Sequence, residues 1–66
     1  MEIQLTRHAQ EKMDLLGIEE SLLIECLAKG ATTKQTDGYL ASYTYLQVVY
    51  KIKPDGTYKI KTIFIE

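Results

Sequence analysis

Residues 48–64 read Val-Val-Tyr-Lys-Ile-Lys-Pro-Asp-Gly-Thr-Tyr-Lys-Ile-Lys-Thr-Ile-Phe. Apolar and polar residues alternate on both sides of the segment 53–56, which is the pattern of two β-strands that each bury one face. Pro54 and Gly56 stand where a type I turn followed by a left-handed residue requires them. The stretch therefore predicts a β-hairpin.

The same alternation predicts which side chains share a face of the hairpin. On the last strand we expect one face to carry Tyr58, Ile60, Thr62 and Phe64 and the other to carry Lys59, Lys61, Ile63 and Ile65. We expect one face of the hairpin to present Lys51, Lys53, Lys59 and Lys61, opposite Tyr50, Ile52, Tyr58 and Ile60. Such a row of lysines fits contact with a nucleic-acid backbone. More commonly it keeps an exposed sheet face soluble.

Upstream of the hairpin the sequence predicts further strands and, nearer the N-terminus, two helices. Aromatic and β-branched residues alternate with smaller or polar ones from residue 39 to 52, as in further strands, whereas residues 31–38 show no period and fit a loop or a weak edge strand. A first helix is expected from the N-cap Thr6 to about Leu16, and a second from Ile18 to Lys29. Gly17 and Gly30 follow the two helices, and residues 2–5 fit a short edge strand or an extended lead-in.

These elements predict an α+β fold. Two N-terminal helices should pack on one face of a twisted antiparallel sheet of three to four strands. With 66 residues, the chain has room for a single domain, residues 1–66. A core of this size is small, because a chain of this length buries only ~60% of the surface that it exposes when unfolded.

Composition excludes several classes of protein. The chain is 45% hydrophobic and 26% charged, an ordinary globular composition, and no apolar run exceeds three residues, so no membrane span is expected. One cysteine allows neither an internal disulfide nor a cysteine-based metal site. We expect a cytoplasmic protein with no metal and no cofactor.

Charge is unevenly distributed along the chain. Eight Lys and Arg face nine Asp and Glu, a net charge of −1 that excludes nucleic-acid binding through excess positive charge alone. Residues 1–30 carry six acidic and three basic side chains, whereas residues 31–66 carry three acidic and five basic ones. The second half is therefore basic within an acidic protein.

The segment Thr6-Arg7-His8-Ala9-Gln10-Glu11-Lys12 contains the strongest candidates for binding or catalysis. A helix N-terminus attracts anions, so Arg7 and His8 in the first turn are unfavourable there unless an anion such as phosphate binds beside them. Lys12 lies one turn beyond His8 on the same face. The more common alternative is that Arg7 pairs with Glu11 at four-residue spacing and that His8 caps the sheet edge.

The tyrosines and the cysteine have structural interpretations. Five tyrosines include three candidate platforms for stacked bases, Tyr43, Tyr45 and Tyr50, although a small sheet needs such side chains to cover its core. Cys26 lies on the apolar stripe of the second helix, where it is expected to act as a small buried hydrophobe.

Taken together, His8-Ala9, Lys12-Met13, Gly17-Ile18 and the final strand around Lys61-Thr62-Ile63-Phe64 resemble the domain-of-unknown-function 4258 family. Members of that family open with Thr-x-His-Ala-x-x-Arg-Met-x-x-Arg-Gly-Ile and close with a strand that bears a threonine. The family is grouped with the RelE-like and barnase-like ribonuclease superfamily. In this chain Lys12 stands where the pattern has its first arginine, and Leu16 where it has the second.

The resemblance implies a metal-independent ribonuclease site where the first helix meets the sheet. His8 would be the general acid or base, Lys12 with Arg7 the electrostatic clamp, and Thr62 the hydroxyl that orients the phosphate. Lysine lacks the planar fork with which arginine grips two phosphate oxygens.

Two functions of different classes follow. The first is a small RNA-acting protein of the RelE-like toxin type, with RNA and an antitoxin-like protein as partners. The alternative is a non-catalytic interaction module that binds another protein or a second copy of itself through the sheet edge or the tyrosines. A phage or plasmid accessory inhibitor is not distinguishable from these by sequence.

Overall fold

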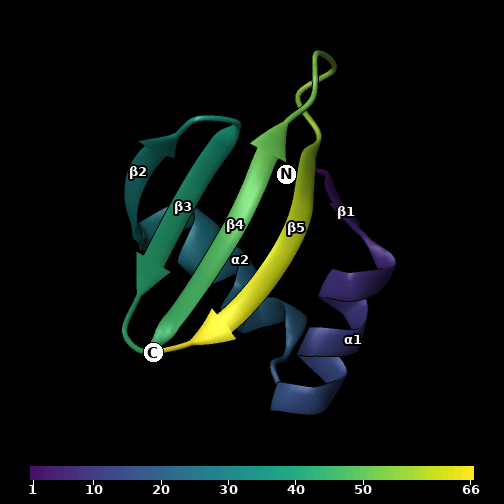
Figure 1. Cartoon of the computed structure of the whole chain (residues 1–66), viewed down its shortest axis with the longest axis vertical. Helices are drawn as coiled ribbons and strands as arrows, with labels where there is room; N and C mark the ends of the chain where they lie inside the picture. The colour runs from purple at the N-terminus through teal and green to yellow at the C-terminus, as the bar shows by residue number, and fades with distance from the viewer.

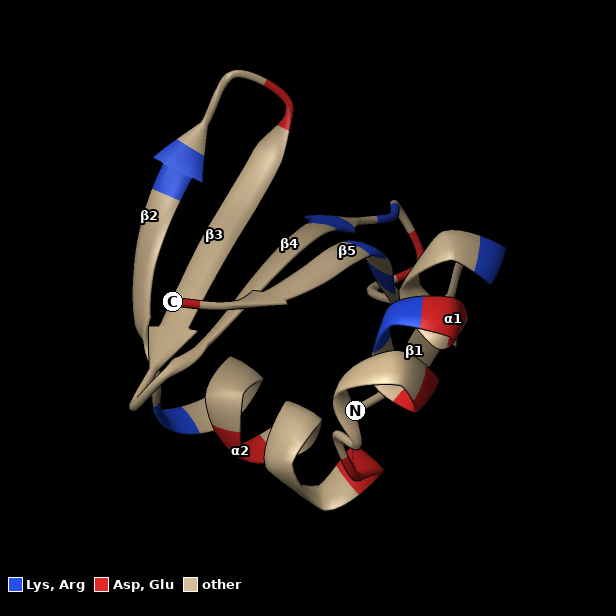
Figure 2. Ribbon diagram, turned by 60° about the horizontal axis from the view of Figure 1, so that its bottom comes forward, with Lys and Arg blue, Asp and Glu red and all other residues tan.

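The computed structural model describes all 66 residues and shows two helices on one side of a five-stranded sheet. In chain order the elements are β1 (Ile3–Leu5), α1 (Arg7–Leu16), α2 (Glu20–Lys29), β2 (Ala31–Gln35), β3 (Gly38–Tyr43), β4 (Leu46–Ile52) and β5 (Tyr58–Ile65) (Figure 1). In the turned view of Figure 2, α2 lies beneath the middle of the sheet and α1 lies near β1 and β5. The α+β class with two N-terminal helices on one face of the sheet is confirmed.

The helices begin and end at the residues that local chemistry favours. The Thr6 side chain accepts a hydrogen bond from the Ala9 backbone N–H at 3.1 Å and so caps α1, and Gly17 ends the helix in the left-handed conformation with φ 69°. α2 begins at Glu20 rather than at Ile18. Ile18 instead lies in the connection between the helices, where its side chain is buried in the core.

The sheet is mixed and not wholly antiparallel, with strand order β1-β5-β4-β3-β2. β1 pairs in parallel with the first half of β5, with Ile3 opposite Tyr58 and Leu5 opposite Ile60. The expectation of three to four antiparallel strands was therefore wrong in strand number and in the orientation of one edge pair. Three residues at the start of a chain carry too little periodicity to predict a partner 55 positions away.

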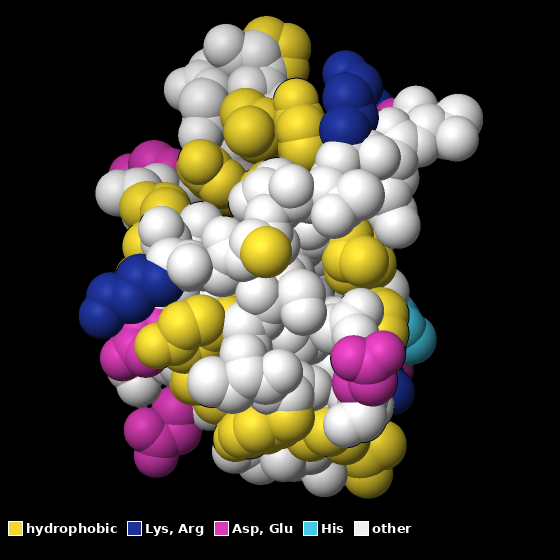
Figure 3. Space-filling view, turned by 90° about the vertical axis from the view of Figure 1, so that its left-hand side faces the viewer, with side chains coloured by type: hydrophobic (Ala, Val, Ile, Leu, Met, Phe, Trp, Pro, Cys, Tyr) yellow, Lys and Arg dark blue, Asp and Glu magenta, His cyan; other side chains and the backbone are white.

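Residues 31–35 form the edge strand β2, one of the two alternatives left open by the sequence. All five residues are exposed, so the strand is held mainly by its antiparallel pairing with β3. The side of the molecule that includes this edge presents mostly polar side chains and backbone, with apolar side chains in separate patches (Figure 3).

A second turn lies inside the run of alternating residues 39–52. β3 ends at Tyr43 and β4 begins at Leu46, which pairs with Tyr43, and Thr44 has φ 53°. Neither turn residue is Gly or Asn, so the sequence contains no signal for this hairpin.

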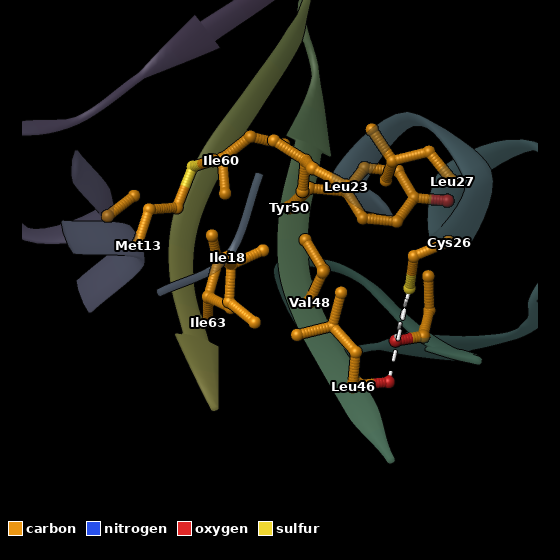
Figure 4. Close-up of a cluster of buried hydrophobic side chains, with 12 residues drawn as sticks. Met13, Ile18, Leu23, Cys26, Leu27, Leu46, Val48, Tyr50, Ile60 and Ile63 are labelled. Atoms are coloured by element: carbon orange, nitrogen blue, oxygen red, sulfur yellow. Dashed lines mark hydrogen bonds between the residues drawn. The ribbon is translucent and has the colours of Figure 1, made fainter. Parts of the chain in front are cut away.

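The core lies between the sheet and the helices (Figure 4). Its twelve buried side chains are Ala9, Met13, Ile18, Leu23, Cys26, Leu27, Ala41, Leu46, Val48, Tyr50, Ile60 and Ile63. Tyr50 stacks against Tyr39 and Tyr58, with ring centroids 5.6 and 5.3 Å away, which makes it a core residue and not a platform for bases. The Cys26 thiol lies 3.6 Å from the Ala41 carbonyl oxygen, and burial raises the pKa of this thiol, as expected for a structural cysteine.

A β-bulge in β5 changes the predicted distribution of side chains. Val49 pairs with Thr62 and Tyr50 pairs with Ile60, which leaves Lys61 without a partner on β4. Ile60 and Ile63 are both fully buried, although strict alternation would place them on opposite faces. The prediction that Ile60, Thr62 and Phe64 share a face was therefore wrong beyond Ile60. Thr62 pairs with Val49 and lies on the face of the sheet opposite the core.

No helix in this structure combines the length and the apolar character that crossing a membrane requires.

Two glycines in turns should differ in their tolerance of a side chain. Gly38 and Gly56 both have positive φ, at 118° and 89°, but a Cβ on Gly38 would collide with the Tyr50 carbonyl oxygen, whereas a Cβ on Gly56 would meet open space. We expect Gly38→Ala to lower the free energy of unfolding by about 2–4 kcal/mol, from backbone strain plus steric clash. Gly56→Ala should cost about 1 kcal/mol. Urea denaturation followed by circular dichroism measures both, and equal costs would contradict the close approach of β3 and β4 at Gly38.

Candidate functional site

His8 and Thr62 form the centre of the candidate site. The His8 Nε2 atom lies 2.9 Å from the Thr62 Oγ1 atom, although 54 positions separate the two residues in the chain. His8 belongs to the first turn of α1 and Thr62 to β5. The His8 side chain is exposed and that of Thr62 is half-buried, so the pair lies at the surface. Two of the three residues predicted to be catalytic are thus in direct contact.

Thr6 holds the start of α1 against β5. Besides capping the helix, its hydroxyl donates to the Lys61 carbonyl oxygen at 3.3 Å, and its backbone N–H donates to the Ile60 carbonyl oxygen at 3.3 Å. β1 ends at Leu5, and the chain turns into the helix at the point where β5 bulges. This junction brings His8 within reach of Thr62 because each residue lies only one or two positions beyond an anchored one.

The other two cations of the N-terminal segment are not part of this contact. Arg7 Nε lies 3.7 Å from a Glu11 carboxylate oxygen, and the Arg7 side chain is 95% exposed, so the structure contains the i,i+4 ion pair that the sequence had left as the alternative. Lys12 follows His8 by one turn of α1, is half-buried and forms no ion pair. Lys12 is thus available to an anion near His8, whereas Arg7 is engaged with Glu11.

An aspartate that the sequence did not single out joins two of the predicted lysines. Asp37, in the turn between β2 and β3, accepts from Lys61 Nζ at 2.8 Å and lies 3.4 Å from Lys51 Nζ. Lys61 Nζ also donates to the Asp37 backbone carbonyl oxygen at 2.7 Å. Asp37 and Lys61 are 24 positions apart, and β5 is a sheet neighbour of neither β2 nor β3, so no local spacing rule could have found this cluster.

The remaining lysines of the predicted row, Lys53 and Lys59, form no ion pair with Asp37. Lys53 follows β4 and donates to the Gln4 side-chain oxygen on β1 at 3.1 Å. Lys59 is exposed, lies opposite Lys51 in the strand register and has no ion-pair partner. In the view of Figure 2, α2 and the connection before it carry acidic residues, whereas the β4–β5 hairpin carries most of the lysines. The β4–β5 hairpin is therefore rich in basic residues.

No group of three or more His, Cys, Asp or Glu side chains lies close enough to hold a metal ion. The arrangement offers an imidazole in contact with a hydroxyl, with ammonium groups on the same strand, β5, and on β4.

The charge of Asp37 should depend on Lys61. The hydrogen bond from Lys61, followed by that from Lys51, holds the pKa of the Asp37 carboxyl below its usual 3.8. Because the folded-state pKa is depressed, the stabilising effect of the ion pairs is complete above the ordinary carboxyl pKa and is lost as the pH falls through the folded value. We expect Lys61→Gln to raise the pKa of Asp37, measured by the pH dependence of its carboxyl carbon signal in NMR.

Asp55 is the matched control, because its pKa is lowered by the backbone N–H of Thr57, 2.9 Å from its carboxylate, and not by Lys61. An Asp37 titration that Lys61→Gln leaves unmoved would contradict the ion pair.

The fold resembles that of a known toxin–antitoxin component. A chain in the crystal structure of the toxin–antitoxin complex RelBE2 from Mycobacterium tuberculosis superposes with a TM-score of 0.64 and 15% sequence identity, over 98% of this chain and 96% of that chain. At this identity the similarity shows a shared fold. Comparison with curated proteins gives no significant match.

The family follows from the sequence itself. The model of a family described as a domain of unknown function, DUF4258, matches residues 5–65, which include the whole His8 to Thr62 span and every element except the start of β1. This chain therefore belongs to the DUF4258 family.

Proposed function

We propose that this protein binds RNA and cleaves it at the His8–Thr62 site without a metal ion. The observation that carries the proposal is the 2.9 Å contact between His8 Nε2 and Thr62 Oγ1 on a surface next to Lys61. The RelE-like fold is consistent with this function, since the similar chain comes from a toxin–antitoxin complex, and an antitoxin-like protein is a corresponding partner. Fold alone does not determine activity, so the proposal depends on the side chains.

The chemistry assigned to His8 uses its free ring nitrogen. Because Nε2 is occupied by Thr62, Nδ1 is the atom left to exchange a proton with the 2′-hydroxyl or the leaving 5′-oxygen of RNA. Imidazole suits both roles because it gains and loses protons near neutral pH. Thr62 acts as a positioning residue that fixes the plane of the ring.

Lys12 supplies positive charge to the same site. It lies on α1 one turn from His8 without a carboxylate partner, so its ammonium group can approach a phosphate that contacts His8. As charge builds up on the phosphate oxygens in the transition state, a nearby ammonium lowers the barrier. Arg7 adds a weaker contribution, because the Glu11 carboxylate offsets its charge.

The test is cleavage of labelled total RNA by the purified protein in EDTA. His8→Ala should reduce the rate about a hundredfold to ten-thousandfold, the usual range for loss of a general acid or base. Gln10→Ala is the matched control, because Gln10 is exposed on the same helix and its side chain hydrogen-bonds to Asp14, not to His8 or Thr62. Equal cleavage by His8→Ala and the parent protein, both folded, would contradict the proposal.

A second pair of variants separates positioning from folding. Thr62→Val keeps the β-branched shape but removes the hydroxyl, so it should lower the rate and change the pH profile, because His8 loses its hydrogen bond. Thr62→Ser keeps the hydroxyl, so it should restore both the cleavage rate and the pH profile. A purely structural threonine would instead be replaced by valine with an unchanged pH profile.

A specific observation also favours the alternative function, an interaction module. Gln35 and Gly38 close the turn between β2 and β3, so the backbone of Lys34 faces the free edge of the fully exposed strand β2. An open edge of this kind can pair with a strand of a second copy of the chain, which would enlarge a small core.

Sedimentation of the purified chain over a range of concentrations tests this edge. Dimers that dissociate in a Lys34→Pro variant would support pairing through β2, because proline blocks an edge strand without disturbing the inner ladder. Monomers at every concentration would contradict self-association.

A further inference from the structure

Asp37 occupies the position of an anion between two ammonium groups. Its Oδ2 atom accepts from Lys61 Nζ at 2.8 Å, and its Oδ1 atom lies 3.4 Å from Lys51 Nζ. Both carboxylate oxygens are thus engaged, as two oxygens of a phosphate diester would be. The Asp37 side chain is 68% exposed, so it faces solvent and competing anions directly.

The bulge in β5 places this cluster beside the candidate catalytic pair. Lys61 is the unpaired residue of the bulge and directly precedes Thr62, which contacts His8. In a regular strand two consecutive side chains point to opposite faces, whereas at a bulge both point to nearly the same face. The lysine cluster and the histidine therefore lie along one continuous stretch of the outer face, as phosphates spaced along a strand of RNA would require.

Electrostatics show that the cluster still attracts anions when Asp37 is bound. Lys51 and Lys59 lie directly opposite each other in the register, and Lys61 shares Asp37 with Lys51. Like charges placed opposite each other destabilise a sheet. One aspartate among three lysines lessens this repulsion but leaves the cluster positive.

Displacing the Asp37 carboxylate requires little rearrangement. It forms exposed ion pairs, which are individually weak. Lys61 also donates to the Asp37 backbone carbonyl oxygen at 2.7 Å, and an ammonium group has three N–H donors. Lys61 can therefore stay anchored to the turn while it exchanges the carboxylate for a phosphate oxygen.

We propose that Lys51 and Lys61 form a phosphate-binding site for the backbone of an RNA strand that extends from His8, and that the Asp37 carboxylate fills this site in the free protein and competes with RNA for it. This inference rests on the proposed function of the His8–Thr62 pair. The Asp37 carboxylate is then a built-in competitor, which lowers the affinity of the protein for short or weakly bound RNA.

A structural role for Asp37 makes the opposite prediction. If the carboxylate only fastens the turn between β2 and β3 to the sheet, its removal loosens the turn and leaves RNA binding equal or weaker. If it competes with phosphate, Asp37→Asn frees both lysines and strengthens binding.

The experiment measures binding of a fluorescent single-stranded RNA of about ten nucleotides by anisotropy at constant low salt. The RNA carries 2′-O-methyl groups so that it cannot be cleaved during the titration. We expect Asp37→Asn to bind roughly threefold to tenfold more tightly than the parent protein. Asp55→Asn is the matched control for net charge, because Asp55 is an exposed turn aspartate that accepts from the Thr57 N–H and forms no ion pair. It should change the affinity less than twofold.

A second comparison places the effect at the two lysines. In a Lys51→Gln/Lys61→Gln background, Asp37→Asn should no longer strengthen binding. A gain that persists there, a gain of equal size in Asp55→Asn, or no gain in Asp37→Asn would each overturn the inference. Circular dichroism and urea denaturation confirm that every variant is folded.

The cleavage assay separates this inference from the proposed function. If the parent protein cleaves RNA through His8 and Asp37→Asn binds no more tightly, the competing role of Asp37 is wrong and the proposed function stands. If no variant binds or cleaves RNA, both are wrong.

Discussion

The junction between Thr6 and the bulge of β5 is the constraint on which the rest of the structure depends. The Thr6 hydroxyl takes part in two hydrogen bonds, accepting from the Ala9 backbone N–H and donating to the Lys61 carbonyl oxygen. The first bond begins α1 and the second fixes that beginning to β5. A single side chain thereby sets where the edge strand stops, where the helix starts and which residue of β5 lies beside the first helical turn.

The bulge itself reconciles two demands on β5. Ile60 and Ile63 must both face the helices to complete the core, yet they are three residues apart, a spacing that regular alternation does not permit. One unpaired residue, Lys61, shifts the alternation of side chains by one position, so that Ile60 and Ile63 both face the helices. As a consequence Lys61 and Thr62 lie together on the outer face, and the basic cluster and the His8–Thr62 pair become neighbours. Core packing has thus shaped the candidate site from the opposite side of the sheet.

Much of the secondary structure was predictable because its signals are local. The cap at Thr6, the stop at Gly17 and the turn at Pro54 and Gly56 each depend on residues within a few positions, and all three lie where predicted. The hairpin turn at Thr44 was missed because neither of its residues favours positive φ, so pairing between β3 and β4 imposes the turn. The parallel pairing of β1 with β5 was missed because it joins the two ends of the chain.

The sequence by itself determined the class of the fold, the helices and the residue types of the site. Periodicity, caps and the family motif each depend on residues that are close together in the chain. The motif identifies His8 and Thr62 as site residues but carries no information about their contact. Only the tertiary structure decided that they touch and that Asp37 lies between Lys51 and Lys61. The contacts of His8 and of Asp37 join residues far apart in the chain, and they depend on strand order and on a one-residue change of register. Neither property can be read from the spacing of residues along a single strand.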